Sequence, residues 1–370
     1  MKKVNTQRVD CLKASVAVGL THKKQKMVAR FDKLSIVSDL GIKKERKQLR
    51  NALFGIHSDI DYKVKFYSSK VRERSSLSAM YEWSIEIQDN NKPDVAKNIV
   101  TIWFKSRWCK RGDFRLEMSP QHFTGKEITQ LVLWLADESR LGDMVFEVLK
   151  KAWITSIHYA LDIYGMRLGD YIIGMERCSK GEVRKDENGM EGIVLGHANT
   201  VAAIYEKVDV SEYSEKDLRK ESYVMLNPGE YRKFLRIEMR FKPKKGALEL
   251  GHLNNMVNLL ERLAFYDKSF IDDPKLDPMF VAALDVKPMP LAMEEHKISP
   301  KINGVKVSIS REAAKKRIRK VRDNYRVEVF DSHMVWLRLF DVIEKLGILG
   351  EPILWYEKPR KRRYSSSDIV

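Results

Sequence analysis

Polar side chains that could carry chemistry alternate with apolar ones in several strand-like segments of the sequence. Successive side chains of a strand point to opposite faces, so each segment separates into an apolar set and a polar set. If these segments share one sheet, its polar face collects Glu117, His158, Asp162, Tyr205, Lys207, Arg236, Glu238 and Arg240. Carboxylates with an imidazole suit Mg²⁺ or Mn²⁺, Lys and Arg neutralise phosphate, and tyrosine can act as a covalent nucleophile. The set indicates metal-assisted phosphate chemistry, and the alternative is an exposed sheet face with ordinary cross-strand ion pairs.

The elements that must position these residues follow from the period of the apolar pattern. Alternation predicts strands at 31–37, 64–67, 81–87, 99–104, 114–118, 154–163, 200–207 and 234–242. Helical spacing predicts one or two helices within 125–151 and further helices at about 248–266, from 311 onward and at 334–346. The stretch 180–192, rich in Gly and charged residues, is expected to be a surface loop.

Two of the predicted strands resemble each other. Residues 114–118 read FRLEM and residues 235–239 read LRIEM, and each follows another strand and precedes a helix. Either a duplicated β-β-β-α unit or chance similarity between alternating strands explains this. We therefore expect an α+β fold with an antiparallel β-sheet core, with or without internal duplication, helices on one face and a C-terminal helical extension.

Composition shifts divide the chain into four regions. Residues 1–29 form a basic N-terminal arm, residues 30–270 a strand-rich domain, residues 271–305 a proline-rich linker, and residues 306–370 a basic helical region with a tail.

The charge balance favours a polyanionic partner. The chain has 370 residues, with 68 Lys and Arg against 51 Asp and Glu, giving a formal net charge of +17. Nucleic acid is the most frequent partner of such a protein. The cysteines, Cys11, Cys109 and Cys178, lack the pairing of a secreted scaffold, and no apolar stretch approaches the roughly 20 residues of a membrane span. A GxxxxGK[ST] phosphate loop is also absent, which disfavours an ATPase or helicase.

Five stretches, in this order, resemble the replication initiation factor family. They are the strand from Phe31, the FRLEMSP segment from Phe114, the ITSIHYALD segment from Ile154, the IYEK segment from Ile204 and the LRIEMR segment from Leu235. The family comprises rolling-circle replication initiators of plasmids and filamentous bacteriophages, including the RstA-type phage replication protein. The resemblance covers residues 30–245 and leaves the C-terminal region outside it.

The resemblance implies an origin-specific single-strand endonuclease and strand transferase that forms a 5′-phosphotyrosine intermediate. It assigns the nucleophile to Tyr205 and metal-binding carboxylates to Glu117, Asp162 and Glu238, with Mg²⁺ or Mn²⁺ as the cofactor. His158 stands where the family has an acid. It either binds the ion directly or orients one of its ligands without touching the ion. The alternative function is a non-catalytic basic DNA-binding regulator.

The same resemblance implies the partners and the location. The partners would be double-stranded origin DNA and its nicked single strand, a host replication helicase and polymerase, and a second copy of the chain, with no membrane involved. The expected location is the bacterial host cytoplasm.

A phenol has a pKa near 10, so attack on a phosphodiester needs help in losing the proton. Lys207 lies on the predicted face of Tyr205 and would favour the phenolate; Tyr213, Tyr223 and Tyr231 are rival nucleophiles outside any strand pattern. Side chains predicted to contact DNA are Arg115, Arg236, Arg240, Lys315, Lys316, Arg319, Lys320, Arg322, Arg360, Lys361, Arg362 and Arg363.

Overall fold

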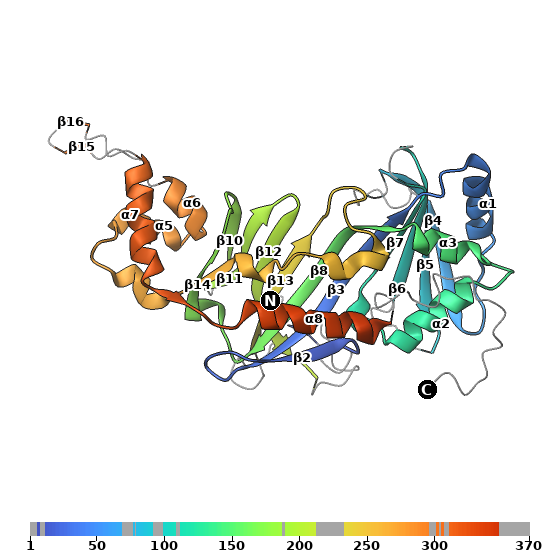
Figure 1. Ribbon diagram of the computed structural model, residues 1–370, viewed down its shortest axis with the longest axis horizontal. Coiled ribbons are helices and arrows are strands. Elements are labelled where there is room, and N and C mark those ends of the chain that lie inside the picture. The colour runs from blue at the N-terminus through green and yellow to red at the C-terminus, as the bar shows by residue number, and fades with distance from the viewer. Residues whose placement is uncertain are drawn as a thin grey trace.

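The predicted strands join into one large, mostly antiparallel β-sheet (Figure 1). The computed structural model describes residues 6–7, 12–68, 77, 79–91, 99–108, 112–186, 189–211, 233–295, 301–302, 305–306 and 311–347. In spatial order the sheet runs β10 (Gly181–Asp186), β11 (Gly189–His197), β12 (Thr200–Asp209), β13 (Lys233–Phe241), β8 (Trp153–Tyr164), β3 (Lys26–Ser38), β7 (Phe114–Met118), β6 (Ile99–Ser106), β5 (Tyr81–Asp89) and β4 (Tyr62–Ser68). Off this path, β2 (Ser15–Leu20) pairs with β3, and β1 (Thr6–Gln7) pairs parallel to β12.

The large sheet consists of two halves that have the same strand order and meet where β3 pairs with β8. In the first half, β3 is followed in the chain by β4 to β7, which run from the outer edge of the sheet back to β3. In the second half, β8 is followed by β10 to β13, which run from the opposite edge back to β8. The similar sequences at 114–118 and 235–239 fall on β7 and β13, which flank the central pair at equivalent places. The topology therefore favours internal duplication over chance, with a larger repeat than the β-β-β-α unit.

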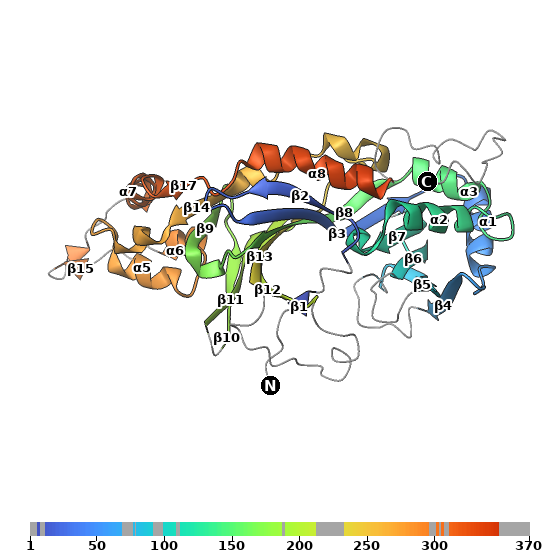
Figure 2. The same ribbon diagram turned by 90° about the horizontal axis from the view of Figure 1, so that it is seen from below.

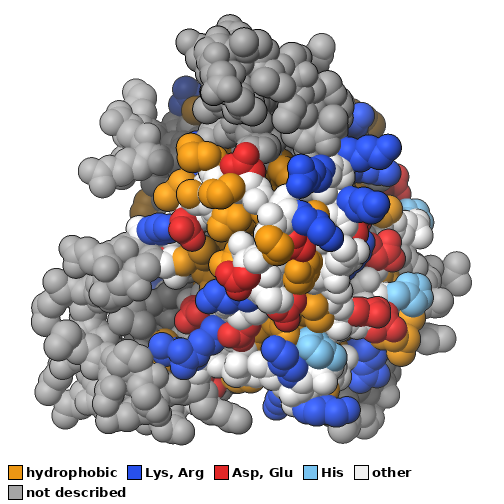
Figure 3. Space-filling view, turned by 90° about the vertical axis from the view of Figure 1, so that its left-hand side faces the viewer, with side chains coloured by type: hydrophobic (Ala, Val, Ile, Leu, Met, Phe, Trp, Pro, Cys, Tyr) orange, Lys and Arg blue, Asp and Glu red, His pale blue; other side chains and the backbone are white. Residues whose placement is uncertain are grey.

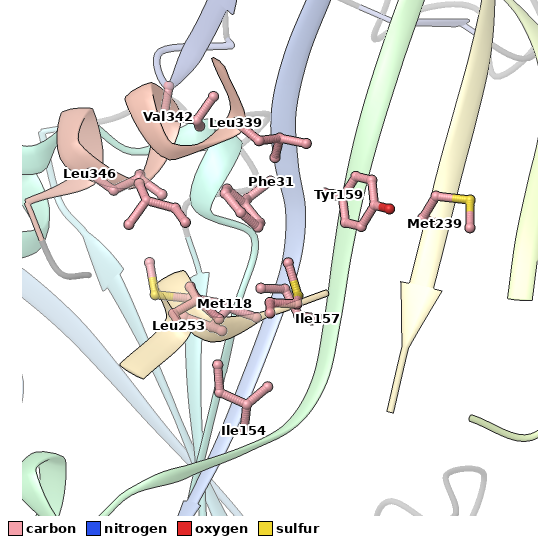
Figure 4. Packing of buried hydrophobic residues seen from close by; sticks show 14 of the residues in the cluster. Phe31, Met118, Ile154, Ile157, Tyr159, Met239, Leu253, Leu339, Val342 and Leu346 are labelled. Carbon is pink, nitrogen blue, oxygen red and sulfur yellow. The ribbon is translucent and has the colours of Figure 1, made fainter. Parts of the chain in front are cut away.

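One face of the sheet carries the main hydrophobic core, covered by α8 (Ser332–Leu346), which lies along β2 and β3 (Figure 2). Asp331 caps the N-terminus of α8 and Gly347, at φ 67°, ends it in the left-handed conformation. Figure 4 shows Leu339, Val342 and Leu346 of α8 beside Phe31 of β3 in this core. Because α8 fills the core, the C-terminal helices belong partly to the sheet domain.

Further helices cover the end of the sheet near β4 to β7. They are α1 (Lys43–Phe54), α2 (Gly125–Leu135) and α3 (Met144–Lys150). The side chain of Thr124 accepts from the backbone of Glu127 and the Glu127 side chain accepts in return, a capping box that starts α2. No described helix combines the length and apolar character that crossing a bilayer requires.

A smaller unit lies beyond β10 and β11 at the other end of the molecule (Figure 1). Its sheet has the order β17 (Arg326–Val327), β14 (Leu263–Asp267) and β9 (Tyr171–Met175), and its helices are α5 (Pro278–Leu284), α6 (Met289–Glu295) and α7 (Arg311–Asp323). A separate apolar cluster around Phe270, Phe280 and Ile318 holds it together. The proline-rich stretch thus contributes two helices, because Asp277 caps α5 and Pro278 occupies its first turn. Lys301–Ile302 (β15) and Val305–Lys306 (β16) form a separate strand pair.

Two sequence-based predictions of secondary structure were wrong. The expected loop at 180–192 is largely the β10–β11 hairpin, because an edge strand tolerates the charged residues that suggested a loop. The expected helix at 248–266 consists of the 3-10 segments η3 (Leu250–Asn255) and η4 (Leu260–Arg262) followed by β14. Gly251 and three asparagines disfavour a continuous helix there, and the aromatic residues Phe265 and Tyr266 favour a strand.

Candidate active site

The polar face of the sheet collects chemically active side chains from three adjacent strands. Register pairs Asp162 of β8 with Arg236 of β13, and His158 with Arg240. On the other side of β13, Arg236 pairs with Tyr205 of β12. Directly opposed residues share a face, so β8, β13 and β12 bring these five side chains to one surface, as the alternation predicts.

A β-bulge in β3 adds a carboxylate to this surface that the alternation did not predict. Phe31 pairs with Tyr159 and Lys33 pairs with His158, which leaves Asp32 as the extra residue between them. One extra residue in a strand changes which face of the sheet each following side chain points to, and it also redirects the side chain of the bulge. Asp32 therefore joins the polar face.

Strict alternation would instead have placed Asp32 with Leu34 and Ile36, both buried in the core. A single charged residue in an otherwise apolar set was the available signal for the bulge, because an unpaired carboxylate is costly in a core.

Asp32, His158 and Glu238 form the group that could hold a metal ion. One ligand atom from each lies within 4.8 Å of the others. Nδ1 of His158 lies 2.8 Å from Oε1 of Glu238, and Nε2 lies 3.2 Å from the hydroxyl of Ser156. Asp32 accepts from the side-chain amide of Gln121. Two carboxylates and an imidazole this close together are a donor set that a divalent ion can share.

Tyr205 lies directly against this group. Its Oη donates to Oε2 of Glu238 at 3.0 Å. Burial and the charge of Glu238 raise the pKa of the Tyr205 phenol well above its ordinary value, while Arg236 opposes this rise. Nζ of Lys207 lies 5.6 Å from the Tyr205 ring centroid. In the resting protein the phenol is therefore neutral and oriented toward the carboxylate.

Glu238 is held as a carboxylate. Burial by itself would raise its pKa, but hydrogen bonds from His158 and Arg240 outweigh this and place the pKa well below its usual range. Arg240 donates to both oxygens of Glu238, at 2.9 and 3.0 Å, and about a third of its side chain is exposed. One carboxylate thus links the tyrosine, the imidazole and a cation.

Asp162, a predicted metal ligand, lies apart from this group of three. It is completely buried, and its two oxygens accept from Nε and Nη2 of Arg236 at 2.6 and 2.8 Å. Nη2 of Arg30 lies 2.6 Å from the second oxygen. The two guanidiniums hold the pKa of Asp162 below its ordinary value although burial acts in the opposite direction. Both oxygens are thus engaged by cations inside the protein.

Glu117, also a predicted ligand, lies on β7 and makes a different set of contacts. Its Oε1 accepts from Ser35 at 3.1 Å and from Arg115 at 3.0 Å, and Nζ of Lys33 lies 3.6 Å away. Burial would raise its pKa, but Arg115 and Lys33 lower it. It is not one of the three residues whose ligand atoms converge.

The side chains predicted to contact DNA are divided among different environments. Arg236 is fully buried against Asp162, Arg115 is mostly buried against Glu117, and Arg240 reaches the surface. On α7, Lys316, Arg319 and Lys320 are exposed. The tail from Arg360 to Arg363 and the rival tyrosines Tyr213, Tyr223 and Tyr231 lie outside the described residues.

Comparison with known proteins yields distant similarities to solved structures. The chain is similar to a rolling circle replication initiator protein from Geobacillus stearothermophilus, at 12% sequence identity and a TM-score of 0.30, over 65% of this chain and 88% of that chain. No family model and no curated protein matches the sequence. A TM-score of 0.30 is too low to indicate a function, so a function for this chain must be inferred from the geometry of the candidate site.

Proposed function

We propose that this chain is a metal-dependent DNA-nicking and strand-joining enzyme that initiates rolling-circle replication of a filamentous phage or plasmid. The observation that carries the proposal is the 3.0 Å hydrogen bond from Tyr205 to Glu238. Glu238 also belongs to the group of three residues able to hold a metal ion. A nucleophile, a set of oxygen and nitrogen ligands and cationic side chains therefore meet on one surface, as a phosphodiester-cutting site requires.

Asp32, His158 and Glu238 are the residues that would hold Mg²⁺ or Mn²⁺. Two carboxylates with one imidazole suit these hard ions, Mn²⁺ tolerating the nitrogen more readily. A bound ion would polarise a phosphoryl oxygen and favour loss of the nearby phenol proton through its charge. In this proposal Asp32 replaces the ligands Glu117 and Asp162 that the family resemblance implies, and His158 is a direct ligand.

Tyr205 supplies the nucleophile for cleavage. Its Oη attacks the phosphorus, the Oη–P bond forms as the bond to the 3′ oxygen breaks, and the phenol proton passes to solvent while the hydrogen bond to Glu238 orients the hydroxyl. The leaving 3′ oxygen takes a proton from solvent and becomes a free 3′-OH able to prime synthesis. In the reverse direction a 3′-OH attacks the phosphotyrosine, restores a phosphodiester and releases Tyr205, so joining needs no ATP.

The cationic side chains serve two roles. Arg240 reaches the surface beside Glu238 and is suited to hold a flanking phosphate, with Lys207 beside the tyrosine ring. Arg236 faces Asp162 inside the protein and lies opposite Tyr205 in register. We assign to Arg236 a positioning role that fixes β13 against β8 and lowers the pKa of the neighbouring phenol.

Covalent capture tests the proposal. The chain is incubated in Mn²⁺ with 3′-labelled single-stranded oligonucleotides that tile the DNA encoding it, and a denaturing gel is used to detect labelled protein. The native chain should form an adduct that Tyr205→Phe loses completely while binding of the same oligonucleotides stays within about twofold.

Tyr325→Phe is the matched control, because the Tyr325 hydroxyl donates to Asp273 in the smaller unit. It should retain the adduct. An adduct of full yield with Tyr205→Phe would refute the assignment, and DNA binding without any adduct from the native chain would favour the non-catalytic DNA-binding regulator.

A further inference from the structure

A cavity of about 380 Å³ lies in the smaller unit between the β9–β14 sheet and helices α6 and α7. Figure 3 looks onto this end of the molecule, where hydrophobic side chains gather near the middle among basic and acidic ones. The cavity shares no residue with the group formed by Asp32, His158 and Glu238. Its volume falls within the range of small-ligand sites, roughly 300–1,000 Å³.

The inner wall of the cavity is apolar and aromatic. Met289 and Met293 of α6 and Tyr266 of β14 line it. Gly174 of β9 keeps this wall open, since a Cβ at that position would lie 3.3 Å from the Tyr266 ring and 3.9 Å from the sulfur of Met289. Methionine sulfur and a tyrosine ring form a surface on which a flat heterocycle packs well.

Cationic side chains line the other side. Lys315, Arg319 and Arg322 recur at the spacing of one helical face of α7, and Arg177 adds a further cation from the segment after β9. The guanidinium of Arg322 lies 5.2 Å from the Tyr266 ring centroid, so the cationic and aromatic walls meet there. Glu176 is the acid among the lining residues. Because cationic side chains outnumber acidic ones on this side of the cavity, they favour an anionic ligand there.

We propose that this cavity binds a nucleoside phosphate, with the base against Met289, Met293 and Tyr266 and the phosphate toward Lys315 and Arg319. An inorganic phosphate would leave the apolar wall without a partner, and an apolar ligand would gain nothing from the excess of cations on the other side. The ligand is either a free nucleotide or the 5′-phosphorylated end of a DNA strand, which share this chemistry. The proposal does not depend on nicking, because no group of the candidate active site takes part.

Calorimetric titration of the full chain, carrying Tyr205→Phe and free of divalent metal, separates this proposal from the nicking reaction. Deoxyadenosine 5′-monophosphate should bind at least tenfold more tightly than deoxyadenosine or inorganic phosphate alone. Arg319→Glu should weaken its binding at least tenfold. Arg317→Glu, the same substitution at an exposed position of α7 outside the cavity lining, should leave it within twofold.

Gly174→Ala provides a second test, because its methyl group would crowd Tyr266 and should weaken binding severalfold with the charges intact. Competition by a 5′-phosphorylated oligonucleotide would place a strand end in the cavity, and its failure to compete would assign a free nucleotide. Equal affinity for inorganic phosphate, or unchanged binding by Arg319→Glu, would overturn the proposal.

Discussion

Glu238 and Glu117 occupy equivalent positions on β13 and β7, but only Glu238 contacts a tyrosine hydroxyl and an imidazole. The proposal therefore predicts unequal effects of one substitution at the two positions. Glu238→Gln should reduce both Mn²⁺ affinity and adduct formation by about 10²-fold, because it removes a charged ligand and the charged acceptor that orients the phenol. Glu117→Gln should change either quantity by less than about tenfold, since its contacts are with Ser35 and Arg115.

Mn²⁺ titration and the covalent-capture gel measure the two effects, and circular dichroism verifies that both variants fold. The opposite ranking, with Glu117→Gln the more damaging, would restore the ligand set implied by the family resemblance. Equal loss in both variants would indicate that the ion is shared between β7 and β13.

At the scale of elements, period-two alternation is enough to separate the core and polar faces of β8, β12 and β13, because these strands are regular where they carry the site. The sequence placed Tyr205, His158 and Glu238 on one polar face for this reason, and the register agrees with that placement. The sequence reasoning missed Asp32 because a one-residue bulge in β3 is a tertiary adjustment that shifts the face of every residue on one side of it. It could not foresee the Arg30 contact with Asp162, since cross-strand partners depend on register.

The ion pair between β8 and β13 leads to a prediction about stability. Asp162→Asn should lower the free energy of unfolding by about 3–5 kcal/mol, because it removes the carboxylate that the buried Arg30 contacts and leaves the buried Arg236 with the more distant Asp32, at 3.7 Å. The folded-state pKa of Asp162 is lowered, so its stabilisation is present above about pH 4 and is lost as the pH falls through the folded-state pKa. Urea denaturation at pH 7 and below pH 4 should show this difference shrinking in acid.

Glu147→Gln is the matched control, since its contact with Lys151 is an exposed pair on α3. It should cost under about 0.5 kcal/mol. Normal stability of Asp162→Asn together with a large loss of Mn²⁺ affinity would instead identify Asp162 as a metal ligand.

At the scale of the whole molecule, the two halves of the sheet repeat a topology but differ in chemistry. Aligning Arg115 with Arg236 places Trp103, which pairs with Arg115, at the position of Tyr205, which pairs with Arg236. The same alignment sets Val37 in the place of Asp162 and Lys33 in the place of His158. The first half therefore has the same strand order but a different residue at the positions of Tyr205, Asp162 and His158, and the net charge of +17 gave no indication of this asymmetry.

The proposed function therefore predicts a single nucleophile per chain, and Trp103→Tyr tests this prediction. Introduced into the Tyr205→Phe variant, this change supplies a phenol at the equivalent position but should not restore an adduct, because Asp32, His158 and Glu238 lie in the other half or at the centre of the sheet. Introduced into the native chain, it should leave one adduct per chain. Mass spectrometry of the digested adduct should find DNA only on the peptide that contains Tyr205, and modification of a β6 peptide in either background would show that both halves are active.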